Sequence, residues 1–295
     1  MAQRQLVAED RSPGEPIYVV KPLAGHDYTL ILLHGLGSNG EKFGKELLET
    51  GVTSSGLTLP QLLPSARFVF PTSKKRRSSA FGRSVITQWF DIANLQDPSI
   101  RKERQLQGLA ESAQDIMTLV QSELKTVSAE RLICGGLSQG CAMSLAILLS
   151  LDRPIGGYIG MSGYLTYQSD LQDAVQEEEE LDENDPFENS EPGFIAHPSV
   201  KAQEFERDLL DLVRLESPKQ EHTAHGTPVF LGHGEIDKKV PVALGRGAAH
   251  VMTAAGYEVR WRTYKDQGHW YKIPEEIDDI IEFISSVIGW EVSSA

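Results

Sequence analysis

Cysteine is scarce in this chain. Cys134 and Cys141 are its two cysteines among 295 residues, and both fall in apolar segments where a small buried side chain is the ordinary interpretation. Two such cysteines indicate no disulfide framework, which is typical of proteins from a reducing compartment.

Long hydrophobic runs are missing as well. No apolar run approaches the roughly 18 residues that cross a bilayer. The first ten residues lack the apolar core of a secretory signal. We therefore expect a soluble, cytoplasmic protein.

The chain has no excess of positive charge. Its formal net charge is −14 and its pI is about 5.0, which argues against nucleic acid as a partner because phosphates must be neutralised on binding. Ten of the acidic residues lie between Asp173 and Glu191, where no Lys or Arg occurs. The rest of the chain is nearly balanced in charge.

Motifs for metal ligation are also lacking. There is no His-Glu-x-x-His, and His222 and His225 have no third ligand at a useful spacing. We expect neither a metal nor a cofactor.

What the chain does contain is an alternation of strand-like and helix-like segments. Helical spacing of apolar residues covers 106–120 and 277–284. Short apolar runs rich in β-branched residues predict strands at 17–20, 28–33, 67–70, 131–135, 157–161, 228–232 and 258–264. This alternation predicts a three-layer α/β/α fold with a mostly parallel central sheet. We expect one domain over 1–295, with an acidic insertion at about 166–227.

The insertion has two parts. Through Glu191 it is acidic and almost free of apolar residues, which predicts a solvated loop. Further on, Phe205, Leu209, Leu212 and Val213 would share one face of a helix over 200–215. Such a helix could pack on the domain, or serve as a lid or a dimer contact. Both a monomer and a homodimer remain open.

The most informative segment is Gly136-Leu137-Ser138-Gln139-Gly140. This Gly-x-Ser-x-Gly sequence lies between a strand-like and a helix-like run, a context that predicts a sharp turn presenting the Ser138 hydroxyl. A serine hydroxyl becomes a nucleophile at neutral pH when a histidine takes its proton and a carboxylate orients that histidine. Ser138 is therefore the candidate nucleophile.

Residues for both supporting roles follow in the chain. His269 comes after the last expected strand, in a glycine-containing loop, and is preferred over His34, which precedes the serine. Asp237 follows the strand at 228–232, with Glu235 as a weaker alternative. Serine, acid and histidine in this order are typical of α/β-hydrolases.

Two backbone N–H groups are candidates for binding the oxyanion. One belongs to Gln139, at the start of the expected helix, and the other to Leu36, in the loop after the strand at 28–33. This loop also creates a rival interpretation, since 35–40 reads Gly-x-Gly-x-x-Gly. The acidic residue that a dinucleotide site places at the end of the next strand is missing.

With these residues identified, the chain resembles the acyl-protein thioesterase / phospholipase-carboxylesterase family of α/β-hydrolases. The resemblance covers roughly 27–160 and 227–288. It is carried by Leu33-His34-Gly35-Leu36-Gly37, Gln88-Trp89-Phe90-Asp91-Ile92, Gly135-Gly136-Leu137-Ser138-Gln139-Gly140, His233-Gly234-Glu235-Ile236-Asp237-Lys238-Lys239-Val240-Pro241 and Gly268-His269.

The resemblance implies a catalytic triad of Ser138, Asp237 and His269, with the Leu36 and Gln139 amides as oxyanion donors. It implies hydrolysis of acyl thioesters on proteins, of lysophospholipids or of small carboxylic esters, without a cofactor. We also expect Leu36 and Trp89 to contact the substrate. A dedicated metabolic esterase and a non-catalytic receptor on the same fold are the alternatives.

Two segments depart from the family pattern. The acidic insertion is one. The other is the segment before Trp89, which carries five basic residues over 74–83 where the family has an apolar cover for a long acyl chain. It could be a solvated loop or a contact site for anionic membrane surfaces.

Overall fold

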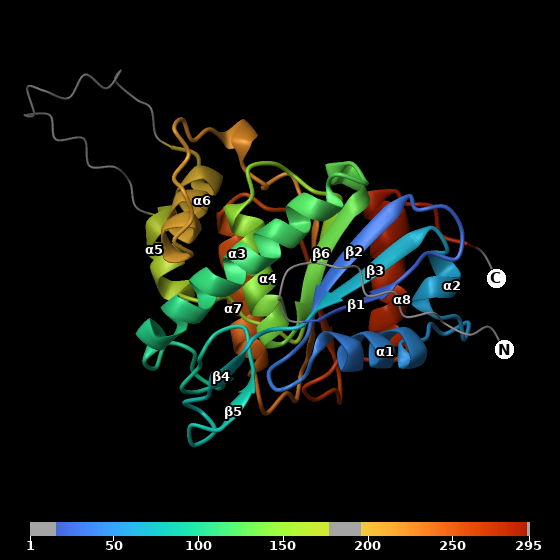
Figure 1. The fold of residues 1–295 in the computed structure, drawn as a ribbon, viewed down its shortest axis with the longest axis horizontal. Coiled ribbons are helices and arrows are strands. Elements are labelled where there is room, and N and C mark those ends of the chain that lie inside the picture. The colour runs from blue at the N-terminus through green and yellow to red at the C-terminus, as the bar shows by residue number, and fades with distance from the viewer. Residues whose placement is uncertain (1–15, 177–195, 294–295) are drawn as a thin grey trace, which may run out of the picture.

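The computed structural model describes residues 16–176 and 196–293, and a seven-stranded sheet forms its centre (Figure 1). The strand order is β1-β3-β2-β6-β7-β8-β9, with β1 antiparallel to β3 and the other pairs parallel. The strands are β1 (Ile17–Val20), β2 (Tyr28–Leu33), β3 (Ala66–Pro71), β6 (Leu132–Leu137), β7 (Gly157–Met161), β8 (Val229–Gly234) and β9 (Val259–Tyr264). These are the seven strands expected from the sequence, with ends shifted by at most two residues.

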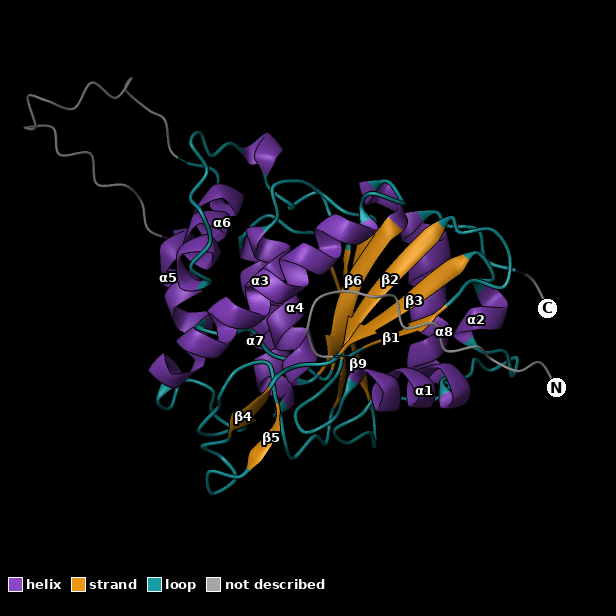
Figure 2. Ribbon diagram, viewed as in Figure 1, coloured by secondary structure: helices purple, strands orange, loops and turns teal. Residues whose placement is uncertain are grey.

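Helices cover both faces of the sheet (Figure 2). Strand β2 shows why its sequence is apolar throughout: Ile31 and Leu33 belong to one hydrophobic core, and Leu30 and Leu32 belong to the other. The helices on the first face are α3 (Leu106–Glu123), α4 (Gln139–Ser150), α5 (Gln168–Gln176), α6 (Pro198–Leu209) and α7 (Val242–Ala254). On the second face lie α1 (Gly40–Thr50), α2 (Leu59–Leu62) and α8 (Glu275–Phe283). This arrangement confirms the expected α/β/α fold.

The chain changes direction across the sheet between β2 and β6. After β2 it builds β3 on one side, and it then returns to place β6 through β9 on the other. Ligands of open α/β sheets bind in the crevice at such a switch point, beyond the carboxyl ends of the strands. Leu33 pairs with Gly136, so the loops that follow β2 and β6 lie side by side.

The insertion forms part of the helical layer. Helix α6 contacts α3, α4 and α5. It ends at Leu209, earlier than the sequence predicted, and Val213 is 83% exposed instead of sharing the buried face. Phe205, Leu209 and Leu212 do pack against the core. The acidic stretch 177–195 lies outside the described residues.

A small hairpin was not expected from the sequence. It pairs β4 (Lys75–Arg77) with β5 (Val85–Thr87) and projects away from the main sheet (Figure 2). Two basic side chains of this segment contact α3: Lys74 Nζ, just before β4, is 2.8 Å from Asp115 Oδ2, and Arg76 Nη1, within β4, is 2.7 Å from Glu111 Oε2. Ion pairs help to hold this hairpin against α3.

Membrane-spanning helices were searched for in the same described ranges. None of the helices found there combines the length and apolarity needed to cross a bilayer.

Candidate active site

Ser138 occupies the turn between β6 and α4. Its φ of 58° and ψ of −120° put a non-glycine residue in a sparsely populated backbone region, where strain is a feature of functional sites. The turn is held by the Ser138 N–H, which donates to the Met161 carbonyl at 2.9 Å. The sharp turn predicted from the sequence is therefore present.

The glycines on either side of Ser138 are required by close packing. A Cβ at Gly136 would lie 2.6 Å from the carbonyl oxygen of Leu33, and a Cβ at Gly140 would lie 2.2 Å from the same oxygen. Real Cβ atoms do not approach an oxygen this closely. The two glycines let the turn pass directly against the end of β2.

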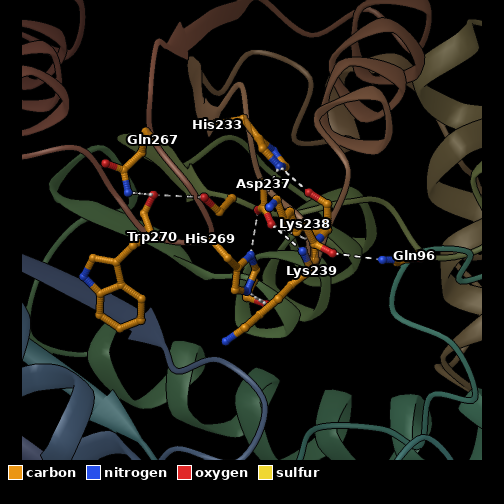
Figure 3. Close-up of polar contacts among 11 residues, drawn as sticks. Gln96, His233, Asp237, Lys238, Lys239, Gln267, His269 and Trp270 are labelled. Atoms are coloured by element: carbon orange, nitrogen blue, oxygen red, sulfur yellow. Dashed lines mark hydrogen bonds and ion pairs between the residues drawn. The ribbon is translucent and has the colours of Figure 1, made fainter.

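Of the three residues expected to form a triad, His269 lies within hydrogen-bond distance of both Ser138 and Asp237, and Figure 3 shows its contact with Asp237. The Nε2 of His269 is 2.8 Å from the Ser138 Oγ, and its Nδ1 is 2.7 Å from the Asp237 Oδ2. An ionised carboxylate only accepts, so Nδ1 carries the proton and Nε2 is free to accept from the serine hydroxyl. This tautomer is the one that a general base needs.

Asp237 is held as an anion by several donors. Its Oδ1 accepts from the N–H groups of Lys239 and Val240 at 2.8 and 3.0 Å. The Nε2 of His233 lies 3.3 Å from its Oδ2. Burial acts to raise the pKa of Asp237, but the hydrogen bonds from His233 and His269 outweigh it and hold this pKa below its usual value. His233 was not singled out in the sequence.

The loop that carries His269 is fixed from two directions. Gln267 Nε2 donates to the carbonyl of Trp270 at 3.2 Å (Figure 3). Ser162 Oγ donates to the same carbonyl, also at 3.2 Å. The imidazole therefore points at Ser138 from a restrained backbone.

The expected oxyanion donors are both available. Among the residues that the structure describes, the N–H groups of Leu36 and Gln139 have no protein acceptor. The peptide before Leu36 is oriented by His34, whose Nδ1 donates to the Gly35 carbonyl at 2.8 Å. The N–H of Gly37 donates to the backbone carbonyl of Thr87 in β5 at 2.8 Å. A negatively charged oxygen could be bound by these two amides.

Trp89 is buried and holds the loop of His34 and Leu36 in place by a hydrogen bond. It is 2% exposed, and its Nε1 donates to the carbonyl of His34 at 2.8 Å. The Gln139 side chain accepts from Trp89 N–H and donates to the Phe90 carbonyl, at 3.0 and 2.8 Å. Trp89 does not line the adjacent cavity, so its position does not support the expected substrate contact; it packs between the two oxyanion segments instead.

A cavity of about 820 Å³ lies beside Ser138 and His269. Leu36, which we expected to contact substrate, lines it. Its other walls include Phe81, Ile86, Leu95, Gln96, Lys238 and Lys239. Residues 166–227 contribute nothing to this lining within their described part, which gives no support to a lid formed by α6.

The alternatives weighed in the sequence lie elsewhere. Glu235 accepts from Thr263 at 3.0 Å on the exposed side of its loop, and His222 lies beside Glu221. Within 16–176 and 196–293, no three His, Cys, Asp or Glu side chains are grouped as a metal site requires.

Known proteins with similar sequences and folds extend this description. Acyl-protein thioesterase 1 of Gibberella zeae is 27% identical over 278 residues, covering 92% of this chain and 96% of the relative. Acyl-protein thioesterase 1 of Saccharomyces cerevisiae is 28% identical over 268 residues, with coverage of 88% and 93%. The crystal structure of Zea mays acyl-protein thioesterase 2 shares the fold, with a TM-score of 0.64, 24% identity and coverage of 94% and 100%.

The family model for phospholipase/carboxylesterase proteins matches residues 15–181 and 212–288. The unmatched residues 182–211 are about half of the insertion, and the model also matches 166–181 and 212–227, so less of the insertion departs from the family than the sequence had suggested. Because the matched ranges take in most of the chain and the whole of the candidate site, this chain belongs to the phospholipase/carboxylesterase family.

Proposed function

We propose that the chain is a serine hydrolase that cleaves carboxylic esters or thioesters through an acyl-enzyme on Ser138. The observation that carries this proposal is the continuous hydrogen-bonded series from Ser138 Oγ through His269 to Asp237, at the wall of an open cavity. A serine outside such a series is a poor nucleophile at neutral pH.

The reaction follows from this geometry. Ser138 Oγ attacks the substrate carbonyl while its proton passes to His269 Nε2, and Asp237 stabilises the imidazolium. The N–H groups of Leu36 and Gln139 stabilise the oxyanion. When the intermediate collapses, His269 gives the proton to the departing alcohol or thiol. Water then attacks the carbonyl of the acyl-enzyme while His269 Nε2 takes its proton. The bond from the carbonyl carbon to Ser138 Oγ breaks, His269 returns the proton to Oγ, and the carboxylic acid is released.

Acylated proteins are the substrates that we propose first. Relatives covered over nearly their whole length carry the name acyl-protein thioesterase 1. Lysophospholipids and small esters fit the description of the family. Comparing rates on thioesters and oxygen esters of increasing acyl length would separate these classes from a dedicated short-chain metabolic esterase.

We further propose peripheral contact with anionic membrane surfaces through residues 74–83. Phe81 and Val85 are 51% and 57% exposed. In the described part of the chain, Lys75, Arg77 and Arg83 have no carboxylate partner, and basic groups near such a surface contribute about 1 kcal/mol each. Co-sedimentation with phosphatidylserine vesicles should weaken in the triple glutamine variant of these three residues.

The central test is covalent labelling. A fluorophosphonate should modify Ser138, and Ser138→Ala should lose both labelling and hydrolysis of p-nitrophenyl esters. Ser285→Ala provides the matched control, because Ser285 is exposed in the turn of residues 284–288, outside the triad, and its hydroxyl donates to the Glu282 carbonyl. Turnover by Ser138→Ala at the wild-type rate would refute the mechanism, and an unreactive wild-type protein would favour a non-catalytic receptor.

A further inference from the structure

Two consecutive lysines stand at the wall of the cavity beside the candidate catalytic histidine. Lys238 and Lys239 follow Asp237 directly and lie close to His269 (Figure 3). Both line the cavity together with Ser138 and His269. Their side chains are exposed. The catalytic chemistry described above makes no use of them.

The two ammonium groups are not neutralised by the protein. Some lysines elsewhere in the fold have carboxylate partners, as Lys74 has in Asp115 and Lys102 in Asp170. For Lys238 and Lys239, the described ranges 16–176 and 196–293 provide no such ion pair. A pair of cations at a cavity wall raises the local concentration of anions and favours anionic ligands.

The backbone fixes where these charges lie. Lys239 N–H donates to Asp237 Oδ1 at 2.8 Å. The carbonyl of Lys238 accepts from Gln96 Nε2 at 3.0 Å (Figure 3). The lysines are thus tied to the residue that orients His269 and to a neighbouring wall of the cavity.

The position of Lys238 and Lys239 in the chain places them on the side of Ser138 where the leaving group departs. The group that leaves must take its proton from His269 Nε2, so it lies on the histidine side of Ser138. Lys238 and Lys239 extend from the loop behind this histidine. The apolar wall built from Leu36, Phe81 and Ile86 suits the hydrocarbon of an acyl group instead.

We propose that the preferred substrates carry a negative charge, a carboxylate or a phosphate, on the departing alcohol or thiol, and that Lys238 and Lys239 bind this charge. The inference rests on the proposed function of Ser138 and specifies its substrate class. An apolar acyl group occupies the wall beside the hairpin, and the anionic leaving group lies against the two lysines.

The test uses three octanoyl thioesters with the same acyl chain. Their leaving thiols are 3-mercaptopropionate, 2-mercaptoethanol and thiocholine, which are anionic, neutral and cationic. Wild type is compared with Lys238→Gln, Lys239→Gln and the double variant. Lys125→Gln is the control, because Lys125 is exposed between α3 and the amino end of β6, whereas the cavity lies beyond the carboxyl ends of the strands. The readout is the ratio of kcat/KM for the charged and neutral thioesters, and comparing this ratio between proteins cancels the intrinsic reactivity of each thiol.

In the double variant the anionic-to-neutral ratio should fall about 10-fold, and each single change should account for about 3-fold, as expected of charge pairs at a solvated wall. In the same double variant, the ratio of kcat/KM for the cationic thioester to that for the neutral one should rise. The preference of the wild type should weaken as NaCl is increased, since salt screens exposed charges. The double variant Lys238→Arg/Lys239→Arg, which retains both positive charges, should keep the preference for the anionic thioester.

Each remaining outcome has a definite meaning. An unchanged ratio in the double glutamine variant overturns the inference while leaving Ser138 catalysis intact. A lysine-dependent preference for p-nitrophenyl hemiglutarate over p-nitrophenyl valerate, with no effect on the thioester series, would put the anion on the acyl side and also overturn it. Absence of hydrolysis of all three thioesters and of p-nitrophenyl valerate by the wild type would instead refute the proposed function, and hydrolysis of the valerate alone would overturn the inference.

Discussion

His34 Nε2 accepts a hydrogen bond of 3.0 Å from the backbone N–H of Ser73. An N–H only donates, so Nε2 carries no proton and the proton of the neutral ring is on Nδ1. From there it is donated to the Gly35 carbonyl at 2.8 Å. Burial lowers the pKa of His34 to about 4, so the ring keeps this form at neutral pH. His34 therefore orients the peptide whose next N–H, that of Leu36, is the proposed oxyanion donor.

Replacing His34 should lower the rate of acyl transfer. In His34→Leu the Gly35 carbonyl loses its donor, and we expect kcat/KM for p-nitrophenyl butyrate to fall about 10- to 100-fold, less than the 10²–10³ typical of losing an oxyanion donor outright. His34→Asn, whose amide can still donate near the Nδ1 position, should recover part of the rate. Equal activity in His34→Leu and wild type would show that the peptide needs no such support.

Asp237→Asn should damage catalysis without removing the histidine. An asparagine NH₂ facing His269 Nδ1 would favour the tautomer with the proton on Nε2, which cannot accept from Ser138. We expect kcat to drop by about 10³–10⁴, as seen for such a change in other triads. Glu235→Gln is the control, because Glu235 contacts Thr263. A larger loss in the control than in Asp237→Asn would assign the acid to Glu235.

Trp89→Phe should lower activity without changing substrate preference. The change leaves the buried His34 carbonyl without its donor, a loss of about 1–3 kcal/mol in the free energy of unfolding. We expect a lower kcat/KM for all acyl lengths, in the same proportion. Phe81→Ala, which alters the cavity wall, should change the preferred acyl length instead. A shift in acyl-length preference in Trp89→Phe would instead indicate that Trp89 contacts the substrate, as the sequence had suggested.

Glu276 should make stability depend on pH. Burial raises its pKa to about 8 from a usual value of 4.5, so between these values the folded state binds a proton that the unfolded state lacks. Its contribution to stability is complete below pH 4.5 and is lost as the pH rises toward 8, by about 1.4 kcal/mol for each pH unit.

Thermal unfolding measured between pH 5 and 9 checks this. Glu276→Gln should have a Tm close to that of wild type at pH 5 and a higher Tm at pH 9, because the amide cannot ionise. Parallel pH profiles of the two proteins would contradict the assignment.

Local patterns in the sequence were sufficient for much of the fold. Seven short runs predicted the seven strands of the main sheet. The signal was strongest for the central strands β2, β6, β7 and β8, because a strand covered on both faces must be apolar at nearly every position. The hairpin of β4 and β5 was missed, since its first strand is three basic residues, and two basic side chains of the segment are paired with carboxylates on α3. The helix near residue 205 was predicted too long because the exposed Val213 was counted on its buried face.

For the site, the sequence identified Ser138, Asp237 and His269 as candidates, and the structure showed the hydrogen bonds that join them. The glycines at 136 and 140, the serine between them and the order of acid and histidine are local signals that needed no coordinates. The part played by Trp89 behind the oxyanion loop, the contact of His233 with Asp237 and the two lysines at the cavity wall carry no periodicity or spacing that would reveal them.

The positions of the strands along the chain, the turn at Ser138 and the candidate residues at strand ends were determined by the sequence alone, because turns and strands depend on neighbours along the chain. Only the tertiary structure decided that His269 lies 2.8 Å from Ser138, 131 residues earlier, and that Asp237, not Glu235, contacts it. Such contacts depend on the pairing and twist of strands distant in sequence, which place loop atoms to within a fraction of an ångström.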